Sequence, residues 1–312
     1  MPSSDRVLII HNPIAGHGRS AKVLPQVKDR LARIGIAFQV VTTERRGHAE
    51  EIAGNADLDG FGIVASMGGD GTLSEVVNGL MARFGGSIPG DLKVAVIPSG
   101  TGNDLLGGAG LPLIWEDWVD ALRTPATRPV DVFKVTDAGG FCRYAVNCFG
   151  VGYDAYVTHR VTQLGTGKIG PLSYMIEALR GLIHFEPGPC AVSPEGSPSV
   201  RYEKLWLLGI VNSEQYGGGM RICPGARFDD GLMSYALLHG IPRRKLLPLV
   251  FLVRGGKHVG KPGVLLGSAP KVRLDASQGF PCHVDGDTVG VKYPVTVQAL
   301  RGALPLVVGP KK

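Results

Sequence analysis

One kind of junction recurs along the first third of the chain and constrains its fold more than any other feature. A short apolar or β-branched run is followed by a turn containing glycine and then by a helical pattern. The junctions are "HNPIAGHGRSA" (11–21), "MGGDGTLSE" (67–75) and "PSGTGND" (98–104). Strands that alternate with helices predict a parallel sheet with helices on its faces. Because ligands bind at the carboxyl ends of such strands, we expect the second and third turns at one ligand-binding edge.

The organisation of the chain changes near residue 130. Before it, strands are expected at 6–11, 38–43, 62–66 and 93–98. After it, strand-like runs follow one another with few helices between them, at 141–152, 205–212, 232–239, 271–275 and 293–300. One helix is expected over 171–183, with its apolar face formed by Leu172, Met175, Ile176, Leu179 and Ile183. The pattern predicts two domains, 1–130 and a mainly antiparallel 131–303, and a final strand at 304–308 that could belong to either.

The turn in "GGDGTLSE" has the composition of a phosphate-binding loop. Thr72 and Glu75 have the spacing of a capping box, so Thr72 is expected to open a helix. Gly69 and Gly71 would let a phosphate approach the backbone N–H groups in front of that helix. Asp70 would repel a phosphate unless a cation such as magnesium lies between them. The structural alternative is a tight turn in which Asp70 is a capping residue.

The other two turns extend this pattern. In "PSGTGND", glycines flank Thr101, and Asp104 ends the motif. In the first turn, Gly16, Gly18 and Ala21 match the G-x-G-x-x-A spacing of a dinucleotide-binding loop, with Glu44 at the end of the next strand. A nicotinamide oxidoreductase is therefore an alternative, but it leaves the two later turns unexplained. The sequence contains no G-x-x-x-x-G-K-[ST] loop, which excludes a P-loop enzyme.

Charge and cysteine content limit the partners and the compartment. The net charge is +6 and the pI about 9.1, which favours acidic partners unless the protein is merely basic. Residues 243–261 hold six Lys/Arg residues and no acid around the apolar "LLPLVFLV" (246–253). This segment predicts contact with an anionic membrane surface, or alternatively a core helix interrupted by Pro248. Five scattered cysteines without a CxxC pair indicate free thiols in a reducing cytoplasm. The sequence shows neither a signal peptide nor the roughly 20-residue apolar run of a spanning helix.

Taken together, the motifs resemble the diacylglycerol kinase catalytic-domain family. "NPIAG", "GGDGTLSE" and "PSGTGND" are followed in the family's order by "VDVFKV", "NCFGVGYDA", "PGARFDDGL" and "HVDGD". The family includes sphingosine and ceramide kinases, and it shares GGDGT with NAD kinases. The resemblance implies an α/β nucleotide-binding domain, a larger C-terminal β-sandwich domain and an active site in the cleft between them.

The resemblance also implies roles for individual residues. Asp285 would be the general base, and Asp70, Asp104 and Asp131 would form an acidic network that organises magnesium. A structural magnesium ion would be held by Arg227, Asp230 and Leu232, the outer two through backbone carbonyls. The implied ATP site consists of Asn12, Pro13, Ile14, Ala15, Gly16, Thr43, Gly69, Asp70, Gly71, Thr72, Leu73, Ser74, Glu75 and Thr101.

Some of these positions have a structural interpretation or depart from the family pattern. "HVDGDTV" is also typical of a β-hairpin with an Asp-Gly turn, and a hairpin tip can deliver a base into a cleft. Ser74 replaces the usual asparagine, and Asp287 replaces the glutamate that many members have after "DG". Both replacements are polar, so we expect activity.

The resulting hypothesis is an ATP- and magnesium-dependent lipid kinase. It would transfer the γ-phosphoryl group of ATP to a lipid hydroxyl, with diacylglycerol as the first substrate and phosphatidic acid as the product. A sphingoid-base or ceramide kinase is the next alternative, followed by a NAD kinase and by a catalytically silent nucleotide- or lipid-binding regulator. We expect a cytoplasmic protein that is peripheral at the inner face of the membrane and does not bind nucleic acid. A homodimer is left open.

Overall fold

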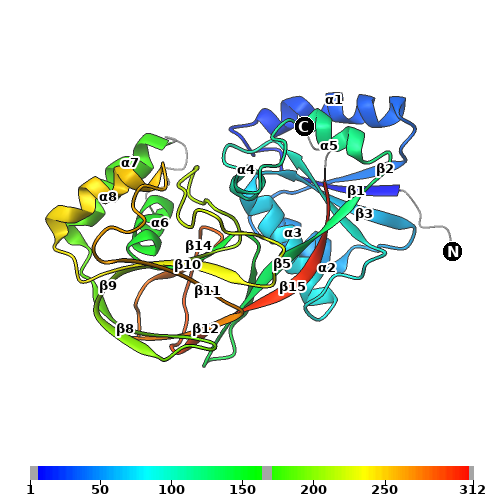
Figure 1. Cartoon of the computed structure of the whole chain (residues 1–312). Coiled ribbons are helices and arrows are strands. Elements are labelled where there is room, and N and C mark those ends of the chain that lie inside the picture. Colours follow the sequence, from blue (N-terminus) through cyan, green and yellow to red (C-terminus); the bar gives the residue numbers. More distant parts are fainter. Residues whose placement is uncertain (1–5, 164–170, 309–312) are drawn as a thin grey trace. The chain divides into compact units, whose positions relative to one another are not determined.

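Two compact units make up the chain in the computed structural model, which describes residues 6–163 and 171–308 and, for 171–175, the backbone alone (Figure 1). The first unit comprises Met1–Val132 and Leu300–Lys312, and the second comprises Phe133–Ala299. The last strand of the chain therefore contributes its end to the first unit.

The first unit is built on a parallel sheet, as the alternating pattern predicts. Its strands lie in the order β4-β3-β1-β2, and β15 joins beside β4 through a parallel pair between Leu306 and Val94. The bounds are β1 (Arg6–His11), β2 (Phe38–Thr42), β3 (Phe61–Gly68), β4 (Lys93–Pro98) and β15 (Val295–Val307). The four strands expected here are confirmed. The runs 293–300 and 304–308, however, belong to one continuous strand.

Helices cover both faces of this sheet. In Figure 1, α1 and α5 lie over one face, whereas α2 and α3 lie over the other. Val27 and Leu31 of α1 pack with Val119 of α5 in the core cluster on the first face. The bounds are α1 (Arg19–Arg33), α2 (His48–Asn55), α3 (Asp70–Arg83), α4 (Asp104–Gly108) and α5 (Trp115–Ala121). Helices α1, α3 and α4 each begin directly after one of the three glycine turns.

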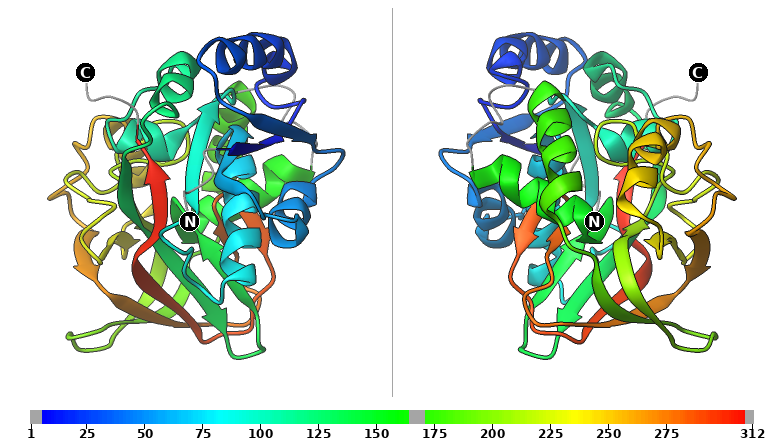
Figure 2. Two further views of the ribbon diagram at one scale, coloured as in Figure 1. Left: turned by 90° about the vertical axis from the view of Figure 1, so that its right-hand side faces the viewer. Right: turned by 90° about the vertical axis from the view of Figure 1, so that its left-hand side faces the viewer.

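The second unit is a β-sandwich around one apolar core, which is the predicted class. Side chains from every strand between β5 and β13, and from β15, enter a single buried cluster that includes Phe133, Phe149 and Ile210. The strands β5 (Thr127–Asp137) and β15 lie side by side (Figure 2). The others are β6 (Cys142–Ala145), β7 (Cys148–Gly152), β8 (Gly188–Pro194), β9 (Val200–Val211), β10 (Met233–His239), β11 (Val264–Ala269), β12 (Lys271–Ala276), β13 (Cys282–Val284) and β14 (Asp287–Val289). The run 141–152, expected as one strand, forms β6 and β7.

The helix expected over 171–183 is present as α7 (Pro171–His184), but its apolar face points outward. Ile176 and Leu179 are each 41% exposed and Ile183 is 64% exposed, whereas Leu182 and Glu177 are buried. The side chains of Leu172 and Met175 lie outside the described residues. The helical pattern was therefore correct, and the described side chains of its apolar face are exposed.

Two further helices accompany α7. The first, α6 (Tyr153–Gln163), begins directly after β7 and was not predicted. The second, α8 (Leu246–Val253), follows the short helix η2 (Arg243–Lys245). Pro248 does not interrupt α8, because it lies in the first turn, where a missing backbone N–H breaks no helical hydrogen bond. The expectation of a core helix is also wrong, since only Leu246 of its eight residues is buried. Within the described ranges, no helix is both long and apolar enough to span a membrane.

Candidate active site

The second and third glycine turns touch each other through their backbones. The N–H groups of Ser99 and Gly100 both donate to the carbonyl of Gly68, at 2.8 Å each. A Cβ atom on Gly100 would lie 2.4 Å from the Cα of Gly69, closer than real side chains approach. Glycine is required at this contact because any side chain would push the two turns apart.

The first turn is joined to the same assembly. Asn12 donates from Nδ2 to the Thr72 hydroxyl at 3.0 Å. Arg19 donates to the carbonyls of Ser99 and Gly100, at 3.3 and 2.8 Å. Gly16, with φ +61°, leaves the space that the Ser99 carbonyl fills, since a Cβ there would lie 2.3 Å from it. The expectation that the second and third turns meet at one sheet edge is thus confirmed by their contacts, and the first turn joins them there.

Helix α3 begins earlier than the sequence predicts, and the expected capping box is wrong. The helix starts at Asp70 behind Gly69, whose carbonyl accepts the N–H groups of Thr72 and Leu73 at 3.0 and 3.1 Å. Thr72 is therefore inside the helix, and its hydroxyl accepts the hydrogen bond from Asn12. The first turn of α3 faces the glycine turns, and a helix N-terminus attracts anions such as phosphate.

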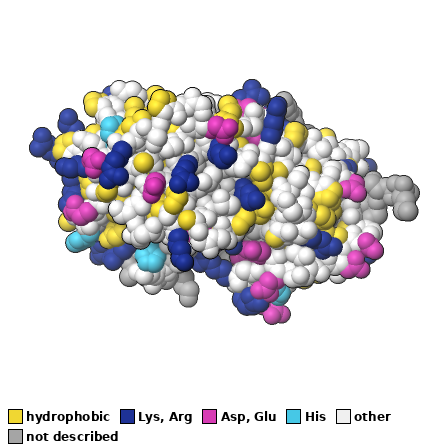
Figure 3. All heavy atoms as spheres, turned by 90° about the horizontal axis from the view of Figure 1, so that it is seen from below, with side chains coloured by type: hydrophobic (Ala, Val, Ile, Leu, Met, Phe, Trp, Pro, Cys, Tyr) yellow, Lys and Arg dark blue, Asp and Glu magenta, His cyan; other side chains and the backbone are white. Residues whose placement is uncertain are grey.

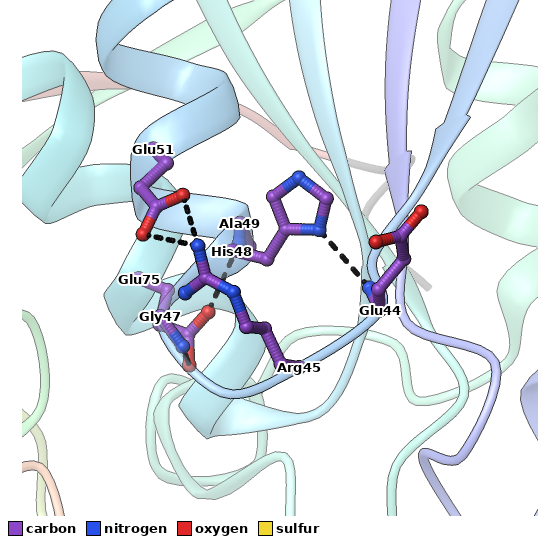
Figure 4. A network of polar contacts seen from close by, with 7 residues as sticks. All are labelled: Glu44, Arg45, Gly47, His48, Ala49, Glu51 and Glu75. Atoms are coloured by element: carbon purple, nitrogen blue, oxygen red, sulfur yellow. Dashed lines mark hydrogen bonds and ion pairs between the residues drawn. The ribbon is translucent and has the colours of Figure 1, made fainter.

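Glu75 holds a different helix from the one that contains it. Its carboxylate accepts the backbone N–H groups of Gly47 at 2.9 Å and Ala49 at 3.2 Å, at the start of α2 (Figure 4). In the same network Arg45 pairs with Glu51 at 2.6 Å, and the backbone N–H of Glu44 donates to the His48 ring at 3.1 Å. Glu75 thereby fixes the loop that follows Thr43.

Two of the predicted acidic residues converge at the third turn. A Cβ atom built on Gly102 would lie 2.7 Å from Oδ2 of Asp70 and 4.0 Å from Oδ2 of Asp104. Carboxylate oxygens are ligands that magnesium prefers, and this ion commonly binds one or two carboxylates together with substrate phosphates. The pair therefore suits a phosphate-bound magnesium ion. No cluster of three or more potential His, Cys, Asp or Glu ligands occurs in the described parts of the chain.

The third predicted acidic residue, Asp131, joins two strands. Its side chain is fully buried, and Oδ1 accepts the Gly302 N–H at 2.7 Å, which ties β5 to β15. A role for Asp131 in organising magnesium remains a prediction.

The other predicted ATP-site residues differ in exposure. Thr72, Leu73 and Ser74 are buried. Thr43 is 8% exposed, and its N–H donates to the His11 carbonyl at 2.8 Å. More accessible are Pro13, Ala15 and Gly16, which are partly exposed, and Ile14, Gly71 and Thr101, which are exposed.

The predicted structural magnesium site lies on a loop of the second unit. Oδ1 of Asp230 accepts the N–H of Leu232 at 3.0 Å, and Arg227 pairs with Asp229 at 3.3 Å. These contacts give the loop its shape, and magnesium binding by Arg227, Asp230 and Leu232 stays a prediction.

Asp285 occupies the tip of the expected β-hairpin. Val284 and Asp287 pair across β13 and β14, which leaves Asp285 and Gly286 as a two-residue turn with φ +48° and +85°. Its carboxylate accepts three backbone N–H groups, from Val146 at 2.8 Å and from Asn147 and Cys148 at 2.9 Å. Such donors favour the charged form and fix its orientation. The sequence did not indicate that Asp285 binds the N–H groups at 146–148, although "NCFG" (147–150) belongs to one of the motifs that resemble the family.

Comparisons with known proteins agree with this architecture. Residues 6–135 match the model of the diacylglycerol kinase catalytic domain, and residues 147–308 match that of the YegS C-terminal NAD kinase beta sandwich-like domain. A "Probable lipid kinase YegS-like" from Xanthomonas euvesicatoria pv. vesicatoria is 30% identical over 82% of this chain and 82% of its own length. The chain belongs to the diacylglycerol kinase family. Members of this family are phosphotransferases with an alcohol acceptor, and this chain is accordingly a lipid kinase.

Other relatives of the family support the assignment. The "Diacylglycerol kinase" of Staphylococcus haemolyticus is 28% identical over 94% of this chain and 85% of its own length. A crystal structure of a diacylglycerol kinase from Bacillus anthracis str. Sterne has the same fold, with a TM-score of 0.70 at 20% identity over 98% of this chain and 97% of that one. The family assignment removes the nicotinamide oxidoreductase alternative.

Proposed function

We propose that this lipid kinase transfers the γ-phosphoryl group of ATP to the hydroxyl of diacylglycerol, giving phosphatidic acid. The observation that carries the nucleotide part is the joined assembly of three turns, with the N-terminus of α3 and the Asp70–Asp104 pair beside it. The choice of diacylglycerol is supported by the names of several relatives. A sphingoid base or ceramide is the second candidate, because these acceptors present the same kind of primary hydroxyl.

On the nucleotide side, the protein supplies positioning and charge. The backbone is partly or fully exposed at 69–71 and at 101–102, and phosphate oxygens can approach it where Gly69, Gly71 and Gly102 leave no side chain in front. Asp70 and Asp104 would hold magnesium, and a bound magnesium ion would neutralise charge on the phosphates during transfer. Ile14 is 79% exposed beside the first turn, where it can border the nucleotide.

On the acceptor side, Asp285 would orient the lipid hydroxyl and accept its proton. A carboxylate is a weak base, and three N–H donors hold this one in a fixed orientation. A weak base is sufficient for phosphoryl transfer through a loose transition state, in which the attacking oxygen forms little bond before the leaving group departs. Orientation of the hydroxyl then matters more than its early deprotonation.

The second unit also offers a surface suited to the membrane that contains the substrate. Helices α7 and α8 are in contact, and each places one buried leucine, Leu182 and Leu246, in the same core cluster while other apolar residues of both helices are exposed. This surface, called the α7–α8 face below, consists of Ile176, Leu179, Ile183, Leu247 and Phe251. Arg244, Lys245 and Arg254 are exposed at the ends of α8.

Apolar side chains flanked by cations fit an anionic lipid surface, where the former insert and the latter meet headgroups. The basic charge of the protein does not by itself identify a docking face. On the side seen in Figure 3, Lys and Arg side chains are scattered among uncharged ones. We infer peripheral contact at the cytoplasmic side of the membrane through the α7–α8 face.

Phosphate transfer to a panel of acceptors tests the function. Labelled ATP with magnesium is supplied with diacylglycerol, monoacylglycerol, sphingosine, ceramide or NAD in mixed micelles. We expect label in diacylglycerol, and its loss in Asp70→Asn and Asp285→Asn, with nucleotide still bound by the Asp285 variant. Label in another lipid would change the substrate, and label in no acceptor would favour a silent binding protein.

Vesicle co-sedimentation tests the membrane surface separately. Phe251→Ser removes the most exposed aromatic side chain of the α7–α8 face, so binding to vesicles of mixed phosphatidylglycerol and phosphatidylcholine should weaken. Val200→Ser is the matched control, because Val200 is a 44% exposed apolar residue on β9 in the same unit. Equal binding by both variants and the wild type would contradict this docking surface.

A further inference from the structure

A buried polar chain lies beneath the hairpin tip that carries Asp285. Oδ2 of Asp154 accepts the Tyr216 hydroxyl at 2.7 Å and lies 3.2 Å from Nε2 of His283. On the other side of the same ring, Nδ1 lies 3.2 Å from the N–H of Gly286. Gly286 is the second residue of the turn, so the chain ends on the residue next to Asp285.

The sheet provides space for this chain at two cross-strand glycines. Gly150 of β7 pairs with His283 of β13 on one side and with Gly209 of β9 on the other. A Cβ atom on Gly150 would lie 2.2 Å from both Oδ2 of Asp154 and Nε2 of His283. A Cβ on Gly209 would lie 3.3 Å from the Tyr216 hydroxyl. The contact between Asp154 and His283 therefore depends on the absence of a side chain at Gly150.

The partners define which nitrogen of His283 carries the proton. The Gly286 N–H can only donate, so Nδ1 must accept, and the proton must be on Nε2, facing Asp154. Tyr216 is 6% exposed, and burial raises its pKa well above the ordinary value, so its hydroxyl keeps the proton that it donates to Asp154. Oδ1 of Asp154 accepts the Ala155 N–H at 2.8 Å, so both carboxylate oxygens are in use.

We propose that His283 and Asp154 are positioning residues for phosphoryl transfer, because they hold the Asp285–Gly286 turn through the Gly286 N–H. This inference rests on the proposed function of Asp285 at the acceptor side. Asp154 fixes the ring and its tautomer, and the ring accepts the N–H that would otherwise be left unpaired beside the turn. The backbone N–H groups at 146–148 bind the carboxylate of Asp285, and the His283 ring binds the N–H of Gly286.

Two substitutions of His283 separate this role from a general contribution to folding. In His283→Asn, the amide oxygen can take the place of Nδ1 and keep an acceptor for Gly286. In His283→Gln, a donor toward Asp154 can be kept, but the acceptor near Gly286 is lost. We expect kcat to fall by roughly 100-fold in His283→Gln, as for a misplacement of about 1 Å, and only a few-fold in His283→Asn. KM for ATP should remain unchanged in both, because the hydrogen bonds given above for this polar chain all join residues of the second unit.

Asp154→Asn and Cys190→Ala complete the set. An amide has one acceptor atom where the structure uses two, so Asp154→Asn should reduce kcat in the manner of His283→Gln. Cys190 is a fully buried core residue of β8, and Cys190→Ala reports the effect of destabilisation alone. All variants are compared at temperatures below their melting points. Equal kcat in His283→Asn and His283→Gln, whether both are reduced or both are normal, would overturn the proposal.

Nitrogen-15 NMR of histidine-labelled wild-type protein gives a second readout that needs no activity. The His283 signal, assigned by its loss in His283→Asn, should show a neutral ring protonated on Nε2. Protonation on Nδ1 would overturn the proposal. Absence of transfer to every acceptor by the wild-type protein would refute the proposed function instead, and the tautomer would still decide whether the polar chain exists.

Discussion

Replacing Gly100 by alanine should damage the nucleotide site through one steric contact. The new Cβ would lie 2.4 Å from the Cα and 2.9 Å from the nitrogen of Gly69, both of them backbone atoms that cannot rotate away. Ordinary contact begins at 3.4 Å. The turns at 68–71 and 100–102 would therefore have to separate by about 1 Å.

Such a separation has two measurable consequences. Overpacking of this kind costs about 1–3 kcal/mol of unfolding free energy. A shift of about 1 Å between groups that position the phosphates can reduce the rate by roughly 100-fold. The N–H groups of Ser99 and Gly100 would also move away from the Gly68 carbonyl.

Urea unfolding and steady-state kinetics with varied ATP would measure both effects. Gly90→Ala is the matched control, because Gly90 lies in the loop before β4 with no atom within 4 Å of the added carbon. We expect Gly90→Ala to behave as the wild type. If Gly100→Ala also unfolds at the wild-type urea concentration and keeps the wild-type kcat/KM for ATP, the two turns are not in the contact described here.

Three further perturbations follow from the same contacts. Gly71→Ala should leave the free energy of unfolding unchanged, because no atom lies near the added carbon. It should raise KM for ATP, because the methyl group would obstruct a phosphate, and an unchanged KM would place the phosphates elsewhere. Glu75→Gln should lower the unfolding free energy by about 1 kcal/mol in urea titrations, since an amide has one acceptor for the two N–H groups at the start of α2. Burial lowers the pKa of His11 and His258 below 6.5 in the folded protein. The unfolded chain therefore binds more protons, and the melting temperature should fall as the pH drops below about 6.5. His258→Gln should weaken this pH dependence, and a melting temperature that does not change with pH would contradict the argument.

The exposed α7–α8 face shows a limit of reading apolar periodicity as core packing. The spacing of Ile176, Leu179 and Ile183 correctly predicts a helix, because residues three and four apart share a face. The same spacing does not distinguish a face that meets the protein core from one that meets another apolar phase. In α7, Ile176, Leu179 and Ile183 are exposed, whereas Leu182, at the flank of the same face, packs in a core cluster.

The sequence by itself determined the parts of this protein that depend on local order along the chain. The parallel sheet, the three glycine turns, the hairpin at Asp285 and the family follow from short motifs and from their succession. These features are local because the backbone conformation of a turn or strand depends mainly on neighbouring residues.

Only the tertiary structure decided which distant residues share a site. Glu75 looks like half of a capping box in sequence, yet it holds α2, because α3 packs beside that helix. Asp285 is bound by N–H groups about 140 residues earlier, and His283 meets Asp154 beside Gly150 of the neighbouring strand. Such partners are set by strand pairing and helix packing between distant segments, and the spacing of residues along the chain contains no direct record of either.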